Sequence, residues 1–286
     1  MKAKTNLTLT NVITLWRKKG LKENLGKWLL IIFVLLWFSF LVLFPLWGII
    51  SETIKSGWKV FIASLAEPAA LHAFWLTIII TIVTIIINTL FGVVLAVMFA
   101  RQNFKGKLLL ESIIDLPFAV SPVVAGFMFI ILFGPQGWIG SWFENANIKI
   151  VYALPGMIIA TIFVTLPFVA REILPTLREF GREQEESAAT LGATDWQTFW
   201  RVTLPSIKWG LTYGVTLTIA RSIGEFGAVL VVSGSIINKT QTATAHIHDQ
   251  FMNFNYAGAF SASLVLAIFS FVILCLIQYL YKKRET

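Results

Sequence analysis

The chain has 286 residues, of which 57% are hydrophobic and only 13% are charged, and its formal net charge is +8. Soluble domains are about one quarter charged, so this composition excludes that class and predicts an all-α polytopic membrane protein. The positive charge requires no nucleic acid as a partner, because lysine and arginine accumulate on the cytoplasmic side of membrane proteins.

Apolar segments recur along the chain, each about as long as the 20 residues that a helix needs to cross the hydrocarbon layer. The third segment is interrupted by Asp115, Pro117 and Pro122 and is the least regular of the set. The six predicted spans are 28–50, 73–100, 113–133, 151–170, 211–232 and 259–281.

Most of the 23 lysines and arginines lie in the two terminal tails and in the second and fourth loops. This asymmetry predicts that both termini and these two loops face the cytoplasm. The predicted organisation is a basic cytoplasmic tail (1–27), a first span with an external loop (28–71), a core (72–281) that contains the cytoplasmic loop 171–209, and a cytoplasmic tail (282–286).

The first span is too long for the apolar core of a cleavable signal peptide, and no small-x-small cleavage pattern follows it. Before it, Trp16 and the basic residues at 17–19 have the composition of an interfacial anchor, with partner binding as the alternative. The single cysteine, Cys275, excludes an internal disulfide.

Polar side chains interrupt the middle spans. Asn88, Ser121 and Thr165 are candidate groups along a membrane pathway. The two prolines of the third span free backbone carbonyls, and a broken helix is tolerated at membrane depth where it lies inside protein or lines a water-filled cavity.

The fourth loop has strong local signals. Gly192 offers the positive φ of a turn, and Thr194 with Gln197 has the form of a capping box that starts a helix. Pro175 is placed to start an earlier helix, and Pro205 predicts that the second helix ends near Leu204, because proline disfavours the α conformation in the residue before it.

Three aromatic residues of this second helix, Trp196, Phe199 and Trp200, share one face at spacing i, i+3, i+4. Either they dock into a groove of a partner protein, or they lie at the headgroup boundary or fold back onto the chain's own helices. The small residues near Gly192 favour docking, because they permit a close backbone approach.

In the fifth span, Arg221 lies near the predicted bilayer midplane, and Glu225 follows one turn later. Either Arg221 adds positive potential to an anion pathway, with Glu225 as its partner or gate, or the two form a structural ion pair. The small residues Gly210, Gly214, Thr218 and Ser222 form a stripe that suits a subunit interface or packing within the chain.

Chemistry of other kinds has weak support. His246 and His248, in the last external loop, are two residues apart and suit a solvated loop better than a metal site. The nearest approach to a phosphate-binding Gly-x-x-x-x-Gly-Lys-Ser/Thr motif has one residue too many and Trp28 in place of the hydroxyl. The chain is therefore expected not to be an enzyme, and to bind neither a metal nor a cofactor itself.

One motif of the fourth loop resembles the signature loop of ABC-importer permeases, Glu-Ala-Ala…Gly…Ile-x-Leu-Pro. Two conservative differences, at Ser187 and Val202, keep the size and character of the family's residues. The matching positions are Glu186, Ser187, Ala188, Gly192, Val202, Leu204 and Pro205.

Three further segments resemble the sulfate/thiosulfate subfamily, and within it the second of the two permease subunits. They are DLPFAVSPVVAG at 115–126, FVTLPFVARE at 163–172 and ARSIGEFGAV at 220–229. The resemblance implies a type I importer fold in which the loop docks on two ATP-binding subunits that hold ATP and magnesium. It also implies a homologous permease partner, an external sulfate-binding protein and the bacterial plasma membrane.

Two alternatives remain on the sequence alone. The first is the same machine carrying another oxyanion such as molybdate, which competition transport separates from sulfate. The second is a stand-alone channel, which conducts without ATP, or a polytopic membrane enzyme, which needs convergent acidic, histidine or cysteine groups at one depth.

Overall fold

The computed structural model describes residues 9–282, with side chains described for residues 26–277 and 279. Within that part every regular element is helical, as expected. Residues 1–8 of the predicted N-terminal tail, the side chains of the anchor at 16–19 and residues 283–286 lie outside the described residues. The chain divides into two units, 1–55 and 56–286, and each is described by itself.

The first unit consists of α1 (Leu9–Ser56), a single 48-residue helix that contains the predicted first span. Its membrane-length part, Gly26–Ser56, measures about 46 Å at ~1.5 Å per residue, more than the hydrocarbon layer requires. Large apolar side chains from Trp28 to Trp47 are exposed around the helix. Such a surface is stable in lipid rather than in water.

The second unit is built around α3 (Pro68–Arg101), α8 (Leu154–Phe180) and α12 (Lys208–Ile223), which pack against one another. One buried cluster, against which Leu211 of α12 packs, joins α3 and α8 to the residue just before α12: Val93, Ala96, Val169, Ile173, Leu177 and Ile207. Helix α15 (Tyr256–Lys282) packs on α14 (Ala243–Met252) and on α2 (Trp58–Ala66). Helix α2 belongs to this unit, which begins at Ser56, and the core boundary at residue 72 stays a prediction.

The third predicted span is not one helix. It is divided into α4 (Lys107–Ile114), α5 (Leu116–Ala119) and α6 (Pro122–Phe133). Val120 and Ser121 are extended before Pro122, which starts α6, because the proline ring disfavours the α conformation in the preceding residue. Helix α6 has 12 residues and is about 18 Å long, too short to cross a bilayer alone.

The fifth predicted span is bent. Helix α12 and α13 (Gly227–Ser233) meet at 52°, with a break at residues 224–226. The described residues contain four helices of membrane length, or five when this bent pair is one span. The count of six spans therefore remains a prediction.

Helix α8 runs ten residues beyond the predicted end of the fourth span at residue 170. Pro175 lies inside this helix instead of starting a new one. Both Pro175 and Arg171, whose carbonyl loses its helical partner to the proline, are exposed, and solvent can satisfy that carbonyl. The helix ends at Gly181, whose φ of +70° turns the chain.

Candidate docking segment and membrane pathway

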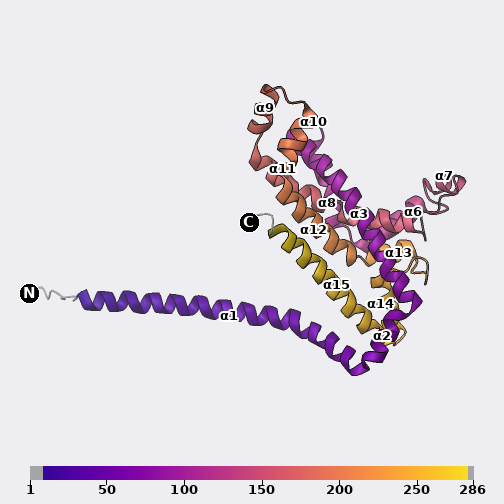
Figure 1. Cartoon of the computed structure of the whole chain (residues 1–286), viewed down its shortest axis with the longest axis horizontal. Helices are drawn as coiled ribbons and strands as arrows, with labels where there is room; N and C mark the ends of the chain where they lie inside the picture. The colour runs from indigo at the N-terminus through magenta and orange to yellow at the C-terminus, as the bar shows by residue number, and fades with distance from the viewer. Residues whose placement is uncertain (1–8, 283–286) are drawn as a thin grey trace, which may run out of the picture. The chain divides into compact units, whose positions relative to one another are not determined.

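The docking segment, residues 181–207, contains four short helical pieces between α8 and α12 and lies at one end of the second unit (Figure 1). They are α9 (Glu183–Thr190), α10 (Asp195–Thr198), the π-helix η1 (Phe199–Thr203) and α11 (Leu204–Ser206). Gly192 has φ +85°, and Thr194 and Gln197 form the predicted capping box with both hydrogen bonds present. Both local predictions are confirmed.

The expected helix end near Leu204 is wrong. Leu204 keeps α conformation before Pro205, and the backbone turns later, at Ile207. The N–H of Leu204 donates to the carbonyl of Phe199, five residues back, so the hydrogen-bond register shifts by one residue just before the proline. Since Pro205 has no N–H to donate, the shift loses no bond there.

The three aromatic residues of the segment divide between the two alternatives. Phe199 is half-buried and packs on the cluster that joins α3, α8 and α12. Trp196 and Trp200 are 69% and 50% exposed, and their ring centroids lie 5.5 Å apart. One aromatic residue therefore anchors the segment to the chain's own core, and two remain available to a partner.

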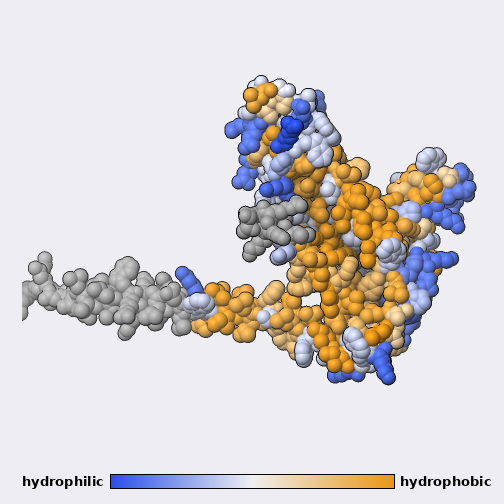
Figure 2. Space-filling view, in the orientation of Figure 1, coloured by the Kyte–Doolittle hydropathy of each residue, from blue (hydrophilic) through white to orange (hydrophobic). Residues whose placement is uncertain are grey.

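Leu191 is a third exposed apolar side chain of the segment and was not singled out from the sequence. It is 89% exposed and directly precedes Gly192. Figure 2 shows a small hydrophobic patch among hydrophilic residues at the end that carries α9 and α10. The position of Leu191 beside the turn glycine, Gly192, was the sequence signal that could have identified it.

Small and acidic residues complete the surface of α9. Glu186 and Ser187 are exposed and Ala188 is half-buried. The Ser187 hydroxyl donates to the carbonyl of Glu183 at 2.7 Å, which keeps this side chain close to the helix. The helix thus presents small side chains and an exposed carboxylate, in the same segment as the two exposed tryptophans.

A polar network connects the docking segment to the long helices. The Glu185 carboxylate pairs with Arg101 at the end of α3, with 2.8 Å between Nε and Oε2. The Thr203 hydroxyl donates to the same carboxylate at 2.8 Å, and the Arg101 guanidinium donates to the carbonyl of Leu177 in α8. The Arg182 guanidinium donates to the carbonyl of Arg101.

Helices α4 and α5 are tied to α8 by three side-chain contacts that sequence reasoning missed. Asp115 accepts from Arg171 Nε at 2.7 Å, and Glu111 pairs with Arg178 at 3.2 Å. The rings of Phe118 and Phe168 also meet edge to face, with 5.4 Å between centroids. Positions 111, 115 and 118 meet 178, 171 and 168, the order expected of antiparallel neighbours, but only the fold shows that these segments are neighbours.

The predicted pairing of Arg221 with Glu225 is present. Arg221 Nη1 lies 2.6 Å from Glu225 Oε2, and the side chains are 33% and 2% exposed. Glu225 lies in the break between α12 and α13, where its other oxygen accepts the N–H of Ala228 at 3.1 Å. The Thr244 hydroxyl donates to the backbone carbonyl of Glu225 at 2.7 Å. The arginine is therefore held by a buried carboxylate while part of its own surface stays accessible.

The other candidate pathway residues fall into two groups. Asn88 and Thr165 are fully buried, and Asn88 Nδ2 donates to Thr165 Oγ1 at 2.7 Å. This bond joins α3 to α8, as polar side chains do between membrane helices. Ser121 is exposed at the start of α6. Burial favours a packing role for the first two residues, and their part in a pathway stays a prediction.

The stripe of small residues on α12 packs within the chain. A Cβ added to Gly210 would lie 2.5 Å from the carbonyl oxygen of Glu172, and one added to Gly214 would lie 2.8 Å from the Cα of Val169. All four stripe residues are buried. These glycines therefore permit the close approach of α12 to α8, and the subunit-interface alternative is not needed for them.

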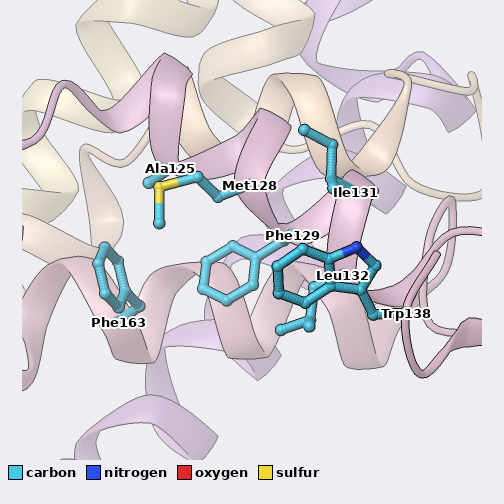
Figure 3. A pocket seen from close by; sticks show the side chains of 7 residues that line it. All are labelled: Ala125, Met128, Phe129, Ile131, Leu132, Trp138 and Phe163. Atoms are coloured by element: carbon cyan, nitrogen blue, oxygen red, sulfur yellow. The ribbon is translucent and has the colours of Figure 1, made fainter.

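An apolar cavity of about 340 Å³ lies between α6 and α8 (Figure 3). The indole Nε1 of Trp138 is the one side-chain hydrogen-bond donor among its lining residues, which are Ala125, Met128, Phe129, Ile131, Leu132, Trp138 and Phe163. The lining suits an apolar occupant better than an anion.

The expectation of a solvated loop is wrong for His246. It is only 3% exposed in α14, and its Nδ1 lies 3.3 Å from Gln241 Oε1. Burial lowers the pKa of His246, against the opposing effect of Glu67 and Asp249. His248 is more exposed, with its ring 5.1 Å from that of Phe226. Among the described residues no group of three or more histidine, cysteine or acidic side chains could hold a metal ion.

Comparison with known proteins places this geometry in a family. Residues 88–286 match the model described as "Binding-protein-dependent transport system inner membrane component". The chain is 48% identical over 257 residues to the sulfate transport system permease protein CysW of Synechocystis sp.. The aligned region covers 90% of this chain and 93% of that protein.

Two different relatives come from Escherichia coli (strain K12). The sulfate transport system permease protein CysW is 42% identical over 97% of this chain and 95% of its own length. The sulfate transport system permease protein CysT is 37% identical over 82% of this chain and 84% of its own length.

A solved structure has the same fold. It is a bacterial alginate ABC transporter in complex with an alginate pentasaccharide-bound periplasmic protein. The matching chain has a TM-score of 0.80 at 17% identity and covers 93% of this chain and 96% of that one. At this identity the likeness concerns the fold alone.

Proposed function

The chain belongs to the family of binding-protein-dependent transport system inner membrane components, the permease subunits of ABC importers, and from this membership we propose that it forms half of a transmembrane pathway for sulfate and thiosulfate. The observation that carries the choice of substrate is the 48% identity with a sulfate permease over nine-tenths of the chain. The other half of the pathway is a homologous permease. The relatives named CysW and CysT support such a pair, because both occur in one organism.

The docking segment is the contact with the energy source. Leu191, Trp196 and Trp200 are its large exposed apolar side chains, and side chains of this kind become anchors when they enter a groove of a partner. We assign the groove to the ATP-binding subunits, two per transporter, which hold ATP and magnesium. When ATP draws these subunits together, they move the docking segment and switch the pore between its inward- and outward-facing states.

Arg221 is the group that we assign to the anion. A positive charge inside the membrane attracts an anion strongly, and an unpaired arginine would bind a divalent anion too tightly for rapid release. The buried Glu225 carboxylate moderates that attraction and holds the guanidinium in place, while a third of the arginine surface stays open. An external sulfate-binding protein delivers the anion, and the complex lies in lipid of the bacterial plasma membrane.

The test is uptake of radiolabelled sulfate by proteoliposomes that contain this chain with its partner permease and ATP-binding subunits. We expect uptake that requires ATP and the external binding protein and that excess thiosulfate inhibits. Empty vesicles and a complex with a hydrolysis-deficient ATP-binding subunit are the controls.

Other outcomes contradict separate parts of the proposal. Inhibition by molybdate but not thiosulfate replaces the substrate and keeps the machine. Anion flux without ATP from the purified chain alone contradicts the importer and supports a channel.

A further inference from the structure

Glu185 lies at the base of the docking segment, on the face of α9 that points toward the long helices. Its side chain is 18% exposed, whereas its neighbours Glu183 and Glu186 are exposed. It is therefore the acidic residue of α9 that the fold uses internally.

Both oxygens of this carboxylate bind groups from other elements. Arg101 Nε lies 2.8 Å from Oε2, and Arg101 Nη2 donates to Oε1 at 3.1 Å. The hydroxyl of Thr203 donates to Oε1 at 2.8 Å, and Thr203 is 4% exposed. Arg101 Nη1 donates in addition to the carbonyl of Leu177 at 3.2 Å. Glu185 and Arg101 together thus connect the ends of α3 and α8 to both halves of the docking segment.

This connection matters because apolar packing does not hold α9. The helix contains no buried residue, whereas the following part of the segment is anchored by Phe199 and Leu204 on the core. A charge-assisted arginine–carboxylate contact is among the stronger polar contacts, and the low exposure of its two side chains, 14% and 18%, limits screening by water and salt. The glycines that flank α9, Gly181 and Gly192, both have positive φ, and a Cβ added to either would meet nothing within 4 Å.

We infer that Glu185, through Arg101 and Thr203, is a positioning residue that makes the docking segment move as one body with α3 and α8. This inference rests on the proposed docking of the segment on ATP-binding subunits. Without the carboxylate, α9 tilts at its two glycines when it is pushed, and the displacement is lost before it reaches the membrane helices. ATP hydrolysis then continues with less transport.

The test uses the full transporter in proteoliposomes and compares Glu185→Gln with the matched control Glu179→Gln, an exposed glutamate of α8 outside the docking segment. The quantity measured is sulfate taken up per ATP hydrolysed. We expect a fall of about fivefold or more for Glu185→Gln, in the range of known coupling effects, and the wild-type ratio for the control. Thr203→Val, which keeps the side-chain shape, should lower the ratio in the same direction by about twofold.

Amide hydrogen exchange supplies a second readout that does not depend on transport. Residues 183–203 should exchange faster in Glu185→Gln than in Glu179→Gln, while α3 and α8 stay protected. If Glu185→Gln does not assemble, Thr203→Val serves for both measurements. Wild-type ratio and exchange in the variants overturn the inference, whereas a wild-type complex without ATP-dependent uptake overturns the proposed function and leaves the exchange test intact.

Discussion

At the scale of single residues, the structure separates side chains with similar sequence signals into different roles. Asn88 and Arg221 are both polar groups within predicted spans, yet Asn88 is fully buried against Thr165 and Arg221 retains accessible surface. A fully buried amide has no surface with which to meet a solute, whereas a partly accessible guanidinium can still meet one. Arg221 is therefore the better position at which to test the anion pathway.

Replacing Arg221 separates its structural role from its functional one. In Arg221→Gln the Glu225 carboxylate keeps its burial and loses its partner, so we expect a loss of about 3–5 kcal/mol of stability. The double variant Arg221→Gln/Glu225→Gln removes the unpaired charge and should recover most of that loss. Thermal unfolding of the purified complex measures both.

Sulfate uptake by the same variants gives the functional answer. If Arg221 serves the anion, the double variant is stable and transports poorly. Normal uptake by the stable double variant would show a purely structural ion pair.

At the scale of elements, α8 is the helix on which the others are assembled. It packs on α3, α12 and α13, and it carries the ion pairs that hold α4 and α5. Its close contact with α12 depends on glycine, because a Cβ at Gly214 would meet the backbone of α8. Small residues of this kind allow membrane helices to approach.

Gly214→Ala should force α12 away from α8 and cost about 1–3 kcal/mol, as overpacking does in other cores. Gly48→Ala in α1 is the matched control, because a Cβ there meets nothing within 4 Å and alanine favours a helix. Thermal midpoints of the two variants in the same detergent test this. Equal midpoints would show that the helices separate without cost.

The docking segment should respond differently to substitution at its two kinds of aromatic residue. Trp196→Ala removes an exposed side chain, and we expect about 2 kcal/mol weaker binding of the ATP-binding subunit, roughly 30-fold in Kd, with an unchanged midpoint of the chain alone. Phe199→Ala opens the core and should lower the midpoint. A midpoint lowered by Trp196→Ala would indicate that this tryptophan is buried in the membrane-bound protein.

At the scale of the whole molecule, the described residues contain four helices of membrane length and one bent pair. The short helix α6 lies in the third predicted span, the one that would bring the count to six. The distribution of lysine and arginine still predicts both termini in the cytoplasm. For the loops after α3 and α6 to lie on opposite sides, the broken segment α4–α6 must cross the bilayer together with its protein neighbours.

Cysteine labelling tests this topology. In a Cys275→Ser background, Lys149→Cys and Lys239→Cys should react with a membrane-impermeant maleimide applied from outside, because both positions are exposed in predicted external loops. Lys105→Cys and Glu183→Cys should react only after the membrane is permeabilised. Labelling of Lys105→Cys from outside would place the α3–α4 loop on the external side and contradict the proposed topology.

Local chemistry made part of the fold and site readable from the sequence. The apolar spans, the capping box of Thr194 and Gln197, the turn at Gly192 and the i,i+4 pair of Arg221 and Glu225 each depend on residues that are close in the chain. The family resemblance likewise rested on a motif with fixed spacing.

Long-range packing decided the rest. The register shift at Pro205, the extension of α8 past Pro175 and the packing of Phe199 on the core depend on what lies against these residues. Arg101 and Glu185 are 84 residues apart, so no local pattern pairs them. The sequence alone determined the apolar, helical character of the chain and the motif of the docking segment, because a membrane and a turn impose local rules. Only the tertiary structure decided how that segment is attached, because attachment depends on distant residues meeting.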